Sequence, residues 1–125
     1  MPGQKRRGRL VASFGFAFRG IVALLRSQAN ARIHFAATVA VVAAGFFFGI
    51  TRLEWCAIVA AIGLVWTAEG LNTAIEYVVD LVSPDQHPLA GRAKDIAAGA
   101  VLIAALIAVL IGALVFIPHL VSPRF

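Results

Sequence analysis

Charged residues are scarce in this chain of 125 amino acids. Only 14% of the residues are charged and 61% are hydrophobic, with a mean hydropathy of +0.90. A soluble domain usually has about 25% charged and about 45–50% apolar residues. So few charges cannot cover the surface of a soluble monomer, and the length allows one domain. The composition therefore predicts a small membrane protein.

Cysteine is almost absent as well. Cys56 is the single cysteine and lies in an apolar run, so the chain has no disulfide framework. We expect its thiol to be buried as a small hydrophobic group. The sequence also lacks a glycine-rich Walker A loop and the interleaved basic and aromatic residues of an RNA-binding motif. These absences exclude a P-loop nucleotide site and give no support to nucleic-acid binding.

Three long apolar segments are present, and each predicts a transmembrane helix. A helix needs about 20 apolar residues to cross the hydrocarbon core of a bilayer. The predicted spans cover residues 33–50, 55–82 and 95–117. The basic stretch before them is too long for a signal peptide, and three apolar segments follow it rather than one. The expected fold is an all-α membrane protein with three spans.

The region before the first span predicts a further helix, which lies in the membrane interface. Apolar residues recur there at helical spacing, and two arginines fall away from that stripe. We expect this amphipathic surface helix over about residues 9–28, as a simple anchor or as a helix that also shapes a site. The membrane domain then covers residues 9–118, between a basic tail (1–8) and a C-terminal tail (119–125).

The distribution of Lys and Arg predicts the orientation. With the N-terminus in the cytoplasm, nine basic residues face the cytoplasm, and only Arg52 and Arg124 face outward. Cytoplasmic segments of membrane proteins carry the excess of Lys and Arg. The cytoplasmic residues would be Lys5, Arg6, Arg7, Arg9, Arg19, Arg26, Arg32, Arg92 and Lys94.

Small residues form stripes on two of the spans. Such stripes allow close approach of helices in lipid, where the hydrophobic effect does not drive association. Three helices are also too few to enclose polar side chains well, so we expect a homo-oligomer. The stripes consist of Ala36, Ala40 and Ala44 in the first span and Ala100, Ala104, Ala108 and Gly112 in the third.

Four polar residues share one face of the second predicted span. At 100° per residue, Glu69, Asn72, Glu76 and Asp80 fall within an arc of about 80° and extend over roughly 16 Å of helix. An acid at the centre of a membrane is costly and is usually functional. By length, Glu69 lies inside the hydrocarbon and the last two acids reach the cytoplasmic interface.

This stripe permits two interpretations. In the first, the deep carboxylate reaches a hydroxyl at headgroup depth and the shallower ones hold a divalent cation. Lys94, at the start of the next helix, could then pair with nucleotide phosphates. In the second, the stripe is an interhelical polar cluster that only locks an oligomer. We expect His34 and His119 to be interfacial and to have no role.

The same residues resemble a known family. Residues 69–76, which read EGLNTAIE and are followed by Asp80, are similar to the first signature of the small bacterial membrane diacylglycerol and undecaprenol kinases. Residues 91–101 resemble their second signature, which contains Ala-Lys-Asp. The resemblance extends over about residues 9–118. It implies a homotrimer in the bacterial inner membrane, with active sites shared between protomers. It also implies transfer of the ATP γ-phosphoryl group to a lipid hydroxyl with Mg²⁺, which feeds phospholipid or lipid-carrier metabolism.

The resemblance also implies a role for individual residues. Glu69 corresponds to the general base, and Glu76 to the metal-binding glutamate. Phe16 stands where some members have a tyrosine. Gln28 stands where the family usually has a second metal-binding glutamate, so the site has one negative charge fewer. The implied substrate-binding positions are Arg9, Glu69, Asn72 and Ala98. The implied nucleotide-binding positions are Arg9, Phe16, Gln28, Glu76, Asp80, Asp85, Gln86, His87, Lys94 and Asp95.

Two rival functions remain at this point. An ion- or proton-conducting oligomer would also carry buried carboxylates, and a weakened homologue could act as a scaffold because of Gln28. Lys94 and Asp95 beside Asp80 favour a kinase, because nucleotide-facing charges outside the membrane are of no use to a conductor. The sequence does not separate diacylglycerol from undecaprenol as the substrate, although residues 30–34 and 80–84 look closer to the undecaprenol type.

Overall fold

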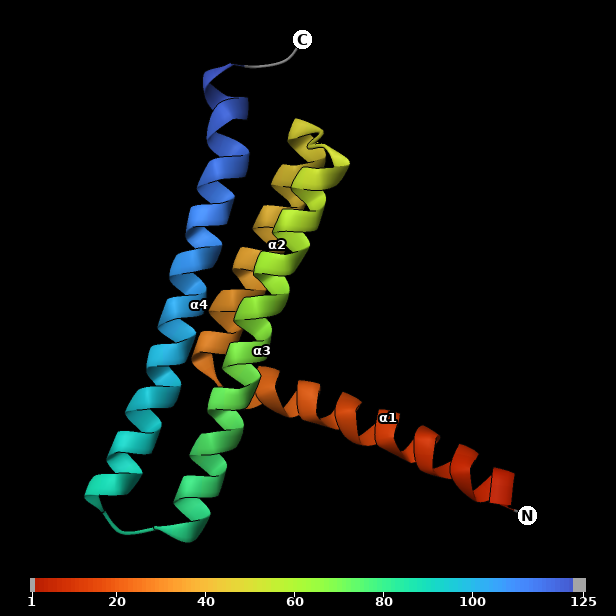
Figure 1. Ribbon diagram of the computed structural model, residues 1–125, viewed down its shortest axis with the longest axis vertical. Coiled ribbons are helices and arrows are strands. Elements are labelled where there is room, and N and C mark those ends of the chain that lie inside the picture. The colour runs from red at the N-terminus through yellow and green to blue at the C-terminus, as the bar shows by residue number, and fades with distance from the viewer. Residues whose placement is uncertain (1, 123–125) are drawn as a thin grey trace.

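The chain folds into four α-helices joined by short connections, and the computed structural model describes residues 2–122 (Figure 1). The helices are α1 (Pro2–Ser27), α2 (Ala29–Phe48), α3 (Arg52–Val82) and α4 (Pro88–Val121). Helices α2, α3 and α4 run alongside one another, whereas α1 projects away from them at a large angle. The described residues contain no strand, which confirms the all-α prediction. Arg124 and the rest of residues 123–125 lie outside the described part of the chain.

Helix α1 is longer than the surface helix expected from the sequence. It begins at Pro2 instead of near residue 9, so the expected basic tail is helical. All four helices, α1 included, are long and apolar enough to cross a membrane by length and composition. The angle of α1 to the bundle suits a helix that lies in the interface. The count of three spans stays a prediction.

The turn between α2 and α3 is shorter than expected. Gly49 ends α2 with φ 59° and ψ 51°, a left-handed conformation that glycine adopts without strain. Two residues later Thr51 starts α3 with a capping box: its hydroxyl accepts from the Glu54 backbone N–H, and the Glu54 carboxylate accepts from the Thr51 N–H. These local signals place the start of α3 at Arg52 rather than residue 55.

The small core lies at the end of the bundle that contains this turn. Ile50, Ile58 and Val115 are buried there and pack against half-buried aromatic rings. In α4, Ala104 is buried, which places part of the predicted small-residue stripe inside the bundle, whereas Ala36 is exposed. Cys56 is exposed, so the prediction of a buried thiol is wrong. Many large apolar side chains are exposed on the outside of the bundle, as contact with lipid would require.

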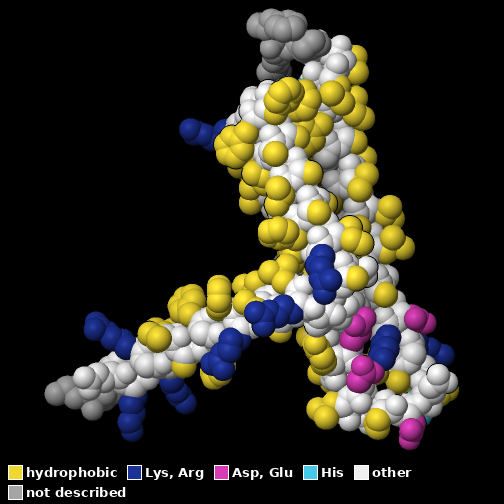
Figure 2. All heavy atoms as spheres, turned by 180° about the vertical axis from the view of Figure 1, so that it is seen from behind, with side chains coloured by type: hydrophobic (Ala, Val, Ile, Leu, Met, Phe, Trp, Pro, Cys, Tyr) yellow, Lys and Arg dark blue, Asp and Glu magenta, His cyan; other side chains and the backbone are white. Residues whose placement is uncertain are grey.

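Charged side chains are concentrated at the opposite end of the molecule (Figure 2). Acidic side chains gather at the end of the bundle where α3 turns into α4, and basic side chains lie along α1 and at the same end. The rest of the bundle in this view is mostly apolar. The polar residues of α3 therefore start among apolar side chains and finish in a charged region.

Candidate active site

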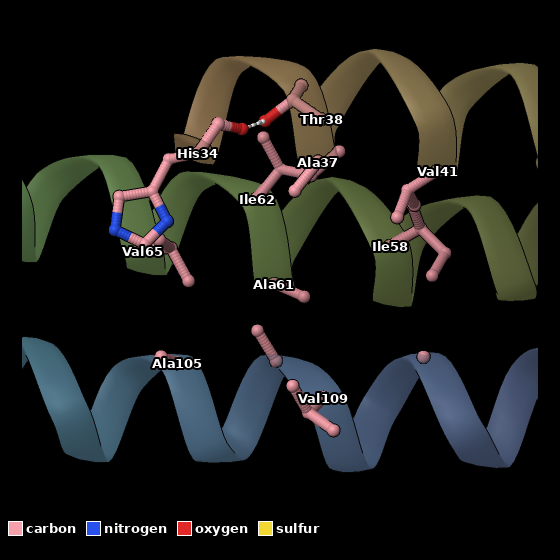
Figure 3. A pocket seen from close by; sticks show the side chains of 12 residues that line it. His34, Ala37, Thr38, Val41, Ile58, Ala61, Ile62, Val65, Ala105 and Val109 are labelled. Atoms are coloured by element: carbon pink, nitrogen blue, oxygen red, sulfur yellow. Dashed lines mark hydrogen bonds between the residues drawn. The ribbon is translucent and has the colours of Figure 1, made fainter. Parts of the chain in front are cut away.

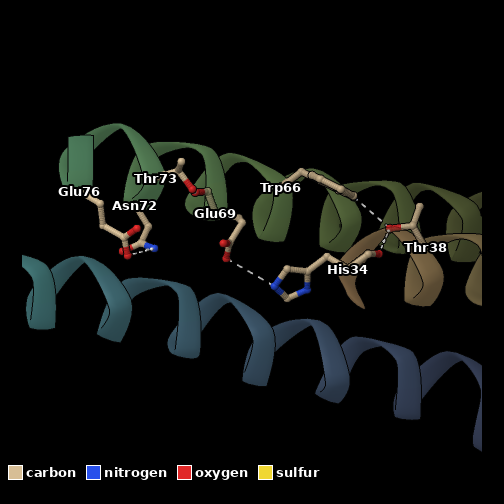
Figure 4. A network of polar contacts seen from close by, with 7 residues as sticks. All are labelled: His34, Thr38, Trp66, Glu69, Asn72, Thr73 and Glu76. Carbon is tan, nitrogen blue, oxygen red and sulfur yellow. Dashed lines mark hydrogen bonds and ion pairs between the residues drawn. The ribbon is translucent and has the colours of Figure 1, made fainter. Parts of the chain in front are cut away.

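The polar face of α3 becomes progressively more exposed toward its C-terminus. Glu69 is 1% exposed and Asn72 is 8% exposed, while Glu76 is half-buried and Asp80 is exposed. The 3.6-residue period of the helix places all four on one side. In Figure 4, Glu69, Asn72 and Glu76 point toward α4, and Glu69 also faces His34 of α2. The predicted shared face is therefore present, with its deepest acid fully enclosed.

Glu76 lies at the centre of a cluster with two amides. Gln28 donates from Nε2 to Oε2 of Glu76 at 3.3 Å, and Asn72 donates from Nδ2 to Oε1 at 3.3 Å. Gln28 reaches this position because it is the residue that precedes α2, with extended backbone angles. The cluster thus joins the start of α2 to the C-terminal part of α3.

This cluster contains oxygen atoms of the kind that bind Mg²⁺. No group of three His, Cys, Asp or Glu residues is close enough to hold a metal among residues 2–122. Mg²⁺, however, is usually bound by one or two carboxylates together with water and substrate phosphates. The Glu76 carboxylate meets that need, and Asn72 Oδ1 is a buried oxygen atom without a hydrogen-bond partner. A turned Gln28 amide would add a third oxygen.

Glu69 has a different environment, with almost no polar partner. Neither carboxylate oxygen makes a hydrogen bond within the described residues. The His34 imidazole lies beside the carboxylate, with Nε2 3.5 Å from Oε2 of Glu69 (Figure 4). No role was expected for His34 from the sequence, and the structure places its ring beside the deepest acid. The sequence feature that could have indicated a role for His34 is its position within a predicted transmembrane span.

Further along the chain, the connection between α3 and α4 forms an open cavity of about 560 Å³. Lys94 reaches across it to pair with Asp80. The His87 ring caps α4, because its Nδ1 accepts from the Leu89 N–H at 3.1 Å. Five of the predicted nucleotide-binding residues line this cavity: Asp80, Asp85, Gln86, His87 and Lys94.

The other predicted site residues are not gathered in the single chain. Asp95 and Ala98 are exposed on α4. Arg9 lies on the projecting α1, where it lines a basic patch with Lys5 and Arg6. Phe16 is on the same helix, and the Arg19 guanidinium lies 4.9 Å from the centre of its ring.

An apolar cavity of about 330 Å³ lies between α2, α3 and α4, on the side of His34 that is away from Glu69 (Figure 3). Apart from His34 and Thr38, it is lined by apolar or small residues, which extend as far as Ile58 and Gly112. Such a cavity suits a hydrocarbon chain and offers almost nothing to an ion. His34 lines it and also faces Glu69, so a chain in the cavity could end close to that carboxylate.

Known proteins are similar to this chain over most of its length. Residues 15–116 match the family described as prokaryotic diacylglycerol kinase. An undecaprenol kinase of Bacillus subtilis is 46% identical over 112 residues, which are 90% of this chain and 91% of that protein. Diacylglycerol kinases of Synechocystis and Escherichia coli K12 are 41% identical over 114 residues and 32% identical over 102 residues. These matches cover 90% and 82% of this chain, and 65% and 84% of those proteins.

Proposed function

The chain belongs to the prokaryotic diacylglycerol kinase family, and on this basis we propose that it transfers the γ-phosphoryl group of ATP to the hydroxyl of a membrane lipid alcohol. The observation that carries this proposal is the enclosed Glu69 carboxylate, which has no hydrogen-bond partner in the described chain. A lipid hydroxyl at that depth would give this carboxylate a hydrogen-bonding partner and a proton to accept.

Glu69 acts as the general base in this mechanism. One carboxylate oxygen accepts the proton of the lipid hydroxyl as the alcohol oxygen forms its bond to the γ-phosphorus of ATP. The bond between that phosphorus and the β,γ-bridging oxygen breaks, and ADP leaves. Phosphoryl transfer depends mainly on positioning and on charge neutralisation, so a base fixed by burial is well suited to it. Asn72, one turn away, would orient the phosphate that is formed.

Glu76, with Gln28 and Asn72, would hold Mg²⁺. The ion, when bound, neutralises the charge of the nucleotide phosphates. Both amides donate from nitrogen to Glu76 in this structure, and with their oxygens turned toward the ion they would add two amide oxygens to the Glu76 carboxylate. Carboxylate and amide oxygens are hard ligands of the kind that Mg²⁺ prefers.

The cavity between α3 and α4 would take the nucleotide. Lys94, which pairs with Asp80, supplies a cationic Nζ for phosphate. Asp85, Gln86 and His87 lie around the same cavity and would contact the rest of the molecule. The cavity adjoins the charged end of the bundle, which we assign to the cytoplasmic face because of the Lys and Arg distribution.

Arg9 and Phe16 fit this site only through assembly. We propose a homotrimer in the bacterial inner membrane, in which α1 of one protomer lies along the interface toward the site of the next. The exposed apolar residues of α1, among them Phe14 and Phe18, suit that location. Such an arrangement would bring both residues to a nucleotide held by a neighbour.

An ion-conducting oligomer is less well supported. A conductor needs polar groups through the whole membrane, but the polar face of α3 ends at Glu69, which lies beside His34 of α2, and the cavity beyond this pair is apolar. A catalytically silent scaffold would not need an enclosed acid whose oxygens make no hydrogen bond within the described residues.

The experiment is an assay of the purified protein with labelled ATP, offered diacylglycerol and undecaprenol separately. The similarity to the Bacillus subtilis relative favours undecaprenol. We expect Mg²⁺-dependent labelling of a lipid by the wild type and none by Glu69→Gln. If neither alcohol is labelled under conditions that keep the oligomer intact, the proposed kinase is wrong.

A further inference from the structure

We propose that His34 is the positioning residue of the catalytic Glu69: its imidazole N–H holds one carboxylate oxygen so that the other faces the substrate hydroxyl. This inference rests on the proposed function and adds a residue from another helix to it. His34 lies on α2 and Glu69 lies on α3, so the pair also depends on how these helices pack.

The first observation is the isolation of Glu69. Glu69 is 1% exposed. Within residues 2–122, His34 is the one Lys, Arg or His residue at ion-pair distance from its carboxylate. The distance from Nε2 to Oε2 is 3.5 Å, slightly longer than a direct hydrogen bond. Catalytic hydrogen bonds are often long before substrate binds and shorten in the complex. A carboxylate enclosed at this depth has a strong need for such a donor.

The second observation is the way in which His34 itself is held. Trp66 donates from Nε1 to Thr38 Oγ1 at 3.0 Å, and Thr38 donates in turn to the backbone carbonyl of His34 at 2.7 Å (Figure 4). The Trp66 ring also meets the imidazole edge to face, with 6.4 Å between ring centres. Two side chains thus fix both the backbone and the ring of His34. A histidine held this firmly can orient a partner.

The third observation concerns the neighbouring charges. Glu76 has its own amide donors, and the Arg32 guanidinium, near His34 on α2, turns away and donates to the carbonyl of Arg26. On α4, the nearest charged residues, Lys94 and Asp95, lie near the cytoplasmic end; Lys94 pairs with Asp80 and Asp95 is exposed. His34 and Glu69 therefore form a separate unit.

The geometry assigns each atom a part in the reaction. In the tautomer with hydrogen on Nε2, His34 donates to Oε2 of Glu69 and leaves Oε1 free to accept the proton of the lipid hydroxyl. After the transfer, Glu69 carries that proton and His34 still donates to the other oxygen. His34 does not line the cavity assigned to the nucleotide, so its loss should lower kcat and leave the KM for ATP unchanged.

The test compares His34→Leu with His34→Gln. Leu keeps the bulk of the ring without a donor, while Gln carries an N–H at nearly the distance of Nε2. We expect His34→Leu to lower kcat at least ten-fold with the KM for ATP within two-fold, and His34→Gln to stay within about three-fold of wild type. His119→Leu is the matched control, because it removes the other histidine–glutamate pair, at 2.8 Å from Glu54 near the turn, and should leave kcat unchanged.

Each outcome decides the proposal. Equal kcat for the Leu and Gln variants, whether high or low, would show that the donor is irrelevant and would overturn it. If His34→Leu does not assemble as the wild type does, His34→Asn replaces it, since its shorter amide cannot reach Glu69; equal activity of Asn and Gln would then overturn the proposal. A wild type that phosphorylates neither lipid overturns the proposed function and this role together, whereas an active wild type matched by His34→Leu overturns this role alone.

Discussion

The side chain of Gln28 donates a hydrogen bond to Glu76 over 3.3 Å, between residues 48 positions apart in the chain. Gln28 is the single residue between α1 and α2, so this bond ties the junction of the two helices to the polar face of α3. An amide can satisfy a carboxylate in this position without charge repulsion. A glutamate at residue 28 would repel Glu76 unless a cation lay between them.

This relationship leads to a prediction about Mg²⁺. Gln28→Glu adds a second carboxylate beside Glu76, so it should lower the Mg²⁺ concentration needed for half-maximal activity. Coulomb attraction between close charges near a protein surface is a few kcal/mol, and desolvation offsets much of it. We expect a net gain of about 1 kcal/mol, or roughly five-fold in Mg²⁺. The measurement is a Mg²⁺ titration of activity at saturating ATP.

The control for this variant is Gln4→Glu, which adds the same charge to an exposed position of α1. It should leave the Mg²⁺ response unchanged. If Gln28→Glu behaves like the control or needs more Mg²⁺, residue 28 is not at the metal and the cluster around Glu76 has another purpose.

Glu69→Gln should abolish phosphoryl transfer and leave the fold intact. Loss of a general base typically lowers the rate about 10²- to 10⁴-fold, and the amide has nearly the same shape as the acid in an enclosed site. The measurement is the initial rate with labelled ATP, together with the elution volume of the detergent-solubilised oligomer. Glu54→Gln is the control, because Glu54 pairs with His119 at the far end of the bundle. A Gln variant with near wild-type rate would remove Glu69 from the base role.

The local features of the site followed from the sequence, and the contacts between helices did not. The helical period alone placed Glu69, Asn72 and Glu76 on one face, because it depends on nothing outside α3. The partnership of His34 with Glu69 depends on how α2 packs against α3, which no local pattern encodes. From the sequence, His34 was expected to be interfacial and without a role.

The same distinction explains the errors. Cys56 lies in an apolar run, but only the packing of α3 decides which side of the helix faces lipid, and this residue is on the outer side. The capping box at Thr51 and the left-handed Gly49 make the turn between α2 and α3 shorter than the ends of the apolar segments suggested. Helix α1 begins at Pro2, so the basic residues before residue 9 are part of a helix.

The orientation of the chain can be tested by thiol labelling. In a Cys56→Ser background, which is needed because the native cysteine is exposed, Ser122→Cys should react with an impermeant thiol reagent on intact cells. Gln4→Cys should react only after lysis. The basis is the excess of Lys and Arg on the side of α1. Protection of residue 122 in intact cells, with labelling of residue 4, would reverse the topology.

The contact between α2 and α3 near the turn predicts a large effect of one methyl group. Gly45 is buried, and a Cβ added there would lie 2.6 Å from Cη2 of Trp55, so the indole ring would have to move. The ring also packs on Phe46, with 4.9 Å between centres, and borders the core of Ile50, Ile58 and Val115. Overpacking of this kind typically destabilises by about 1–3 kcal/mol.

Gly63→Ala is the matched control: it is also within a helix, has nothing within 4 Å of the added Cβ, and should be neutral or slightly stabilising because alanine favours helix. The measurement is the midpoint temperature of thermal aggregation in detergent, which should fall for Gly45→Ala and stay or rise for Gly63→Ala. Equal midpoints for both variants would mean that α2 and α3 do not approach as closely at Gly45 as this packing requires.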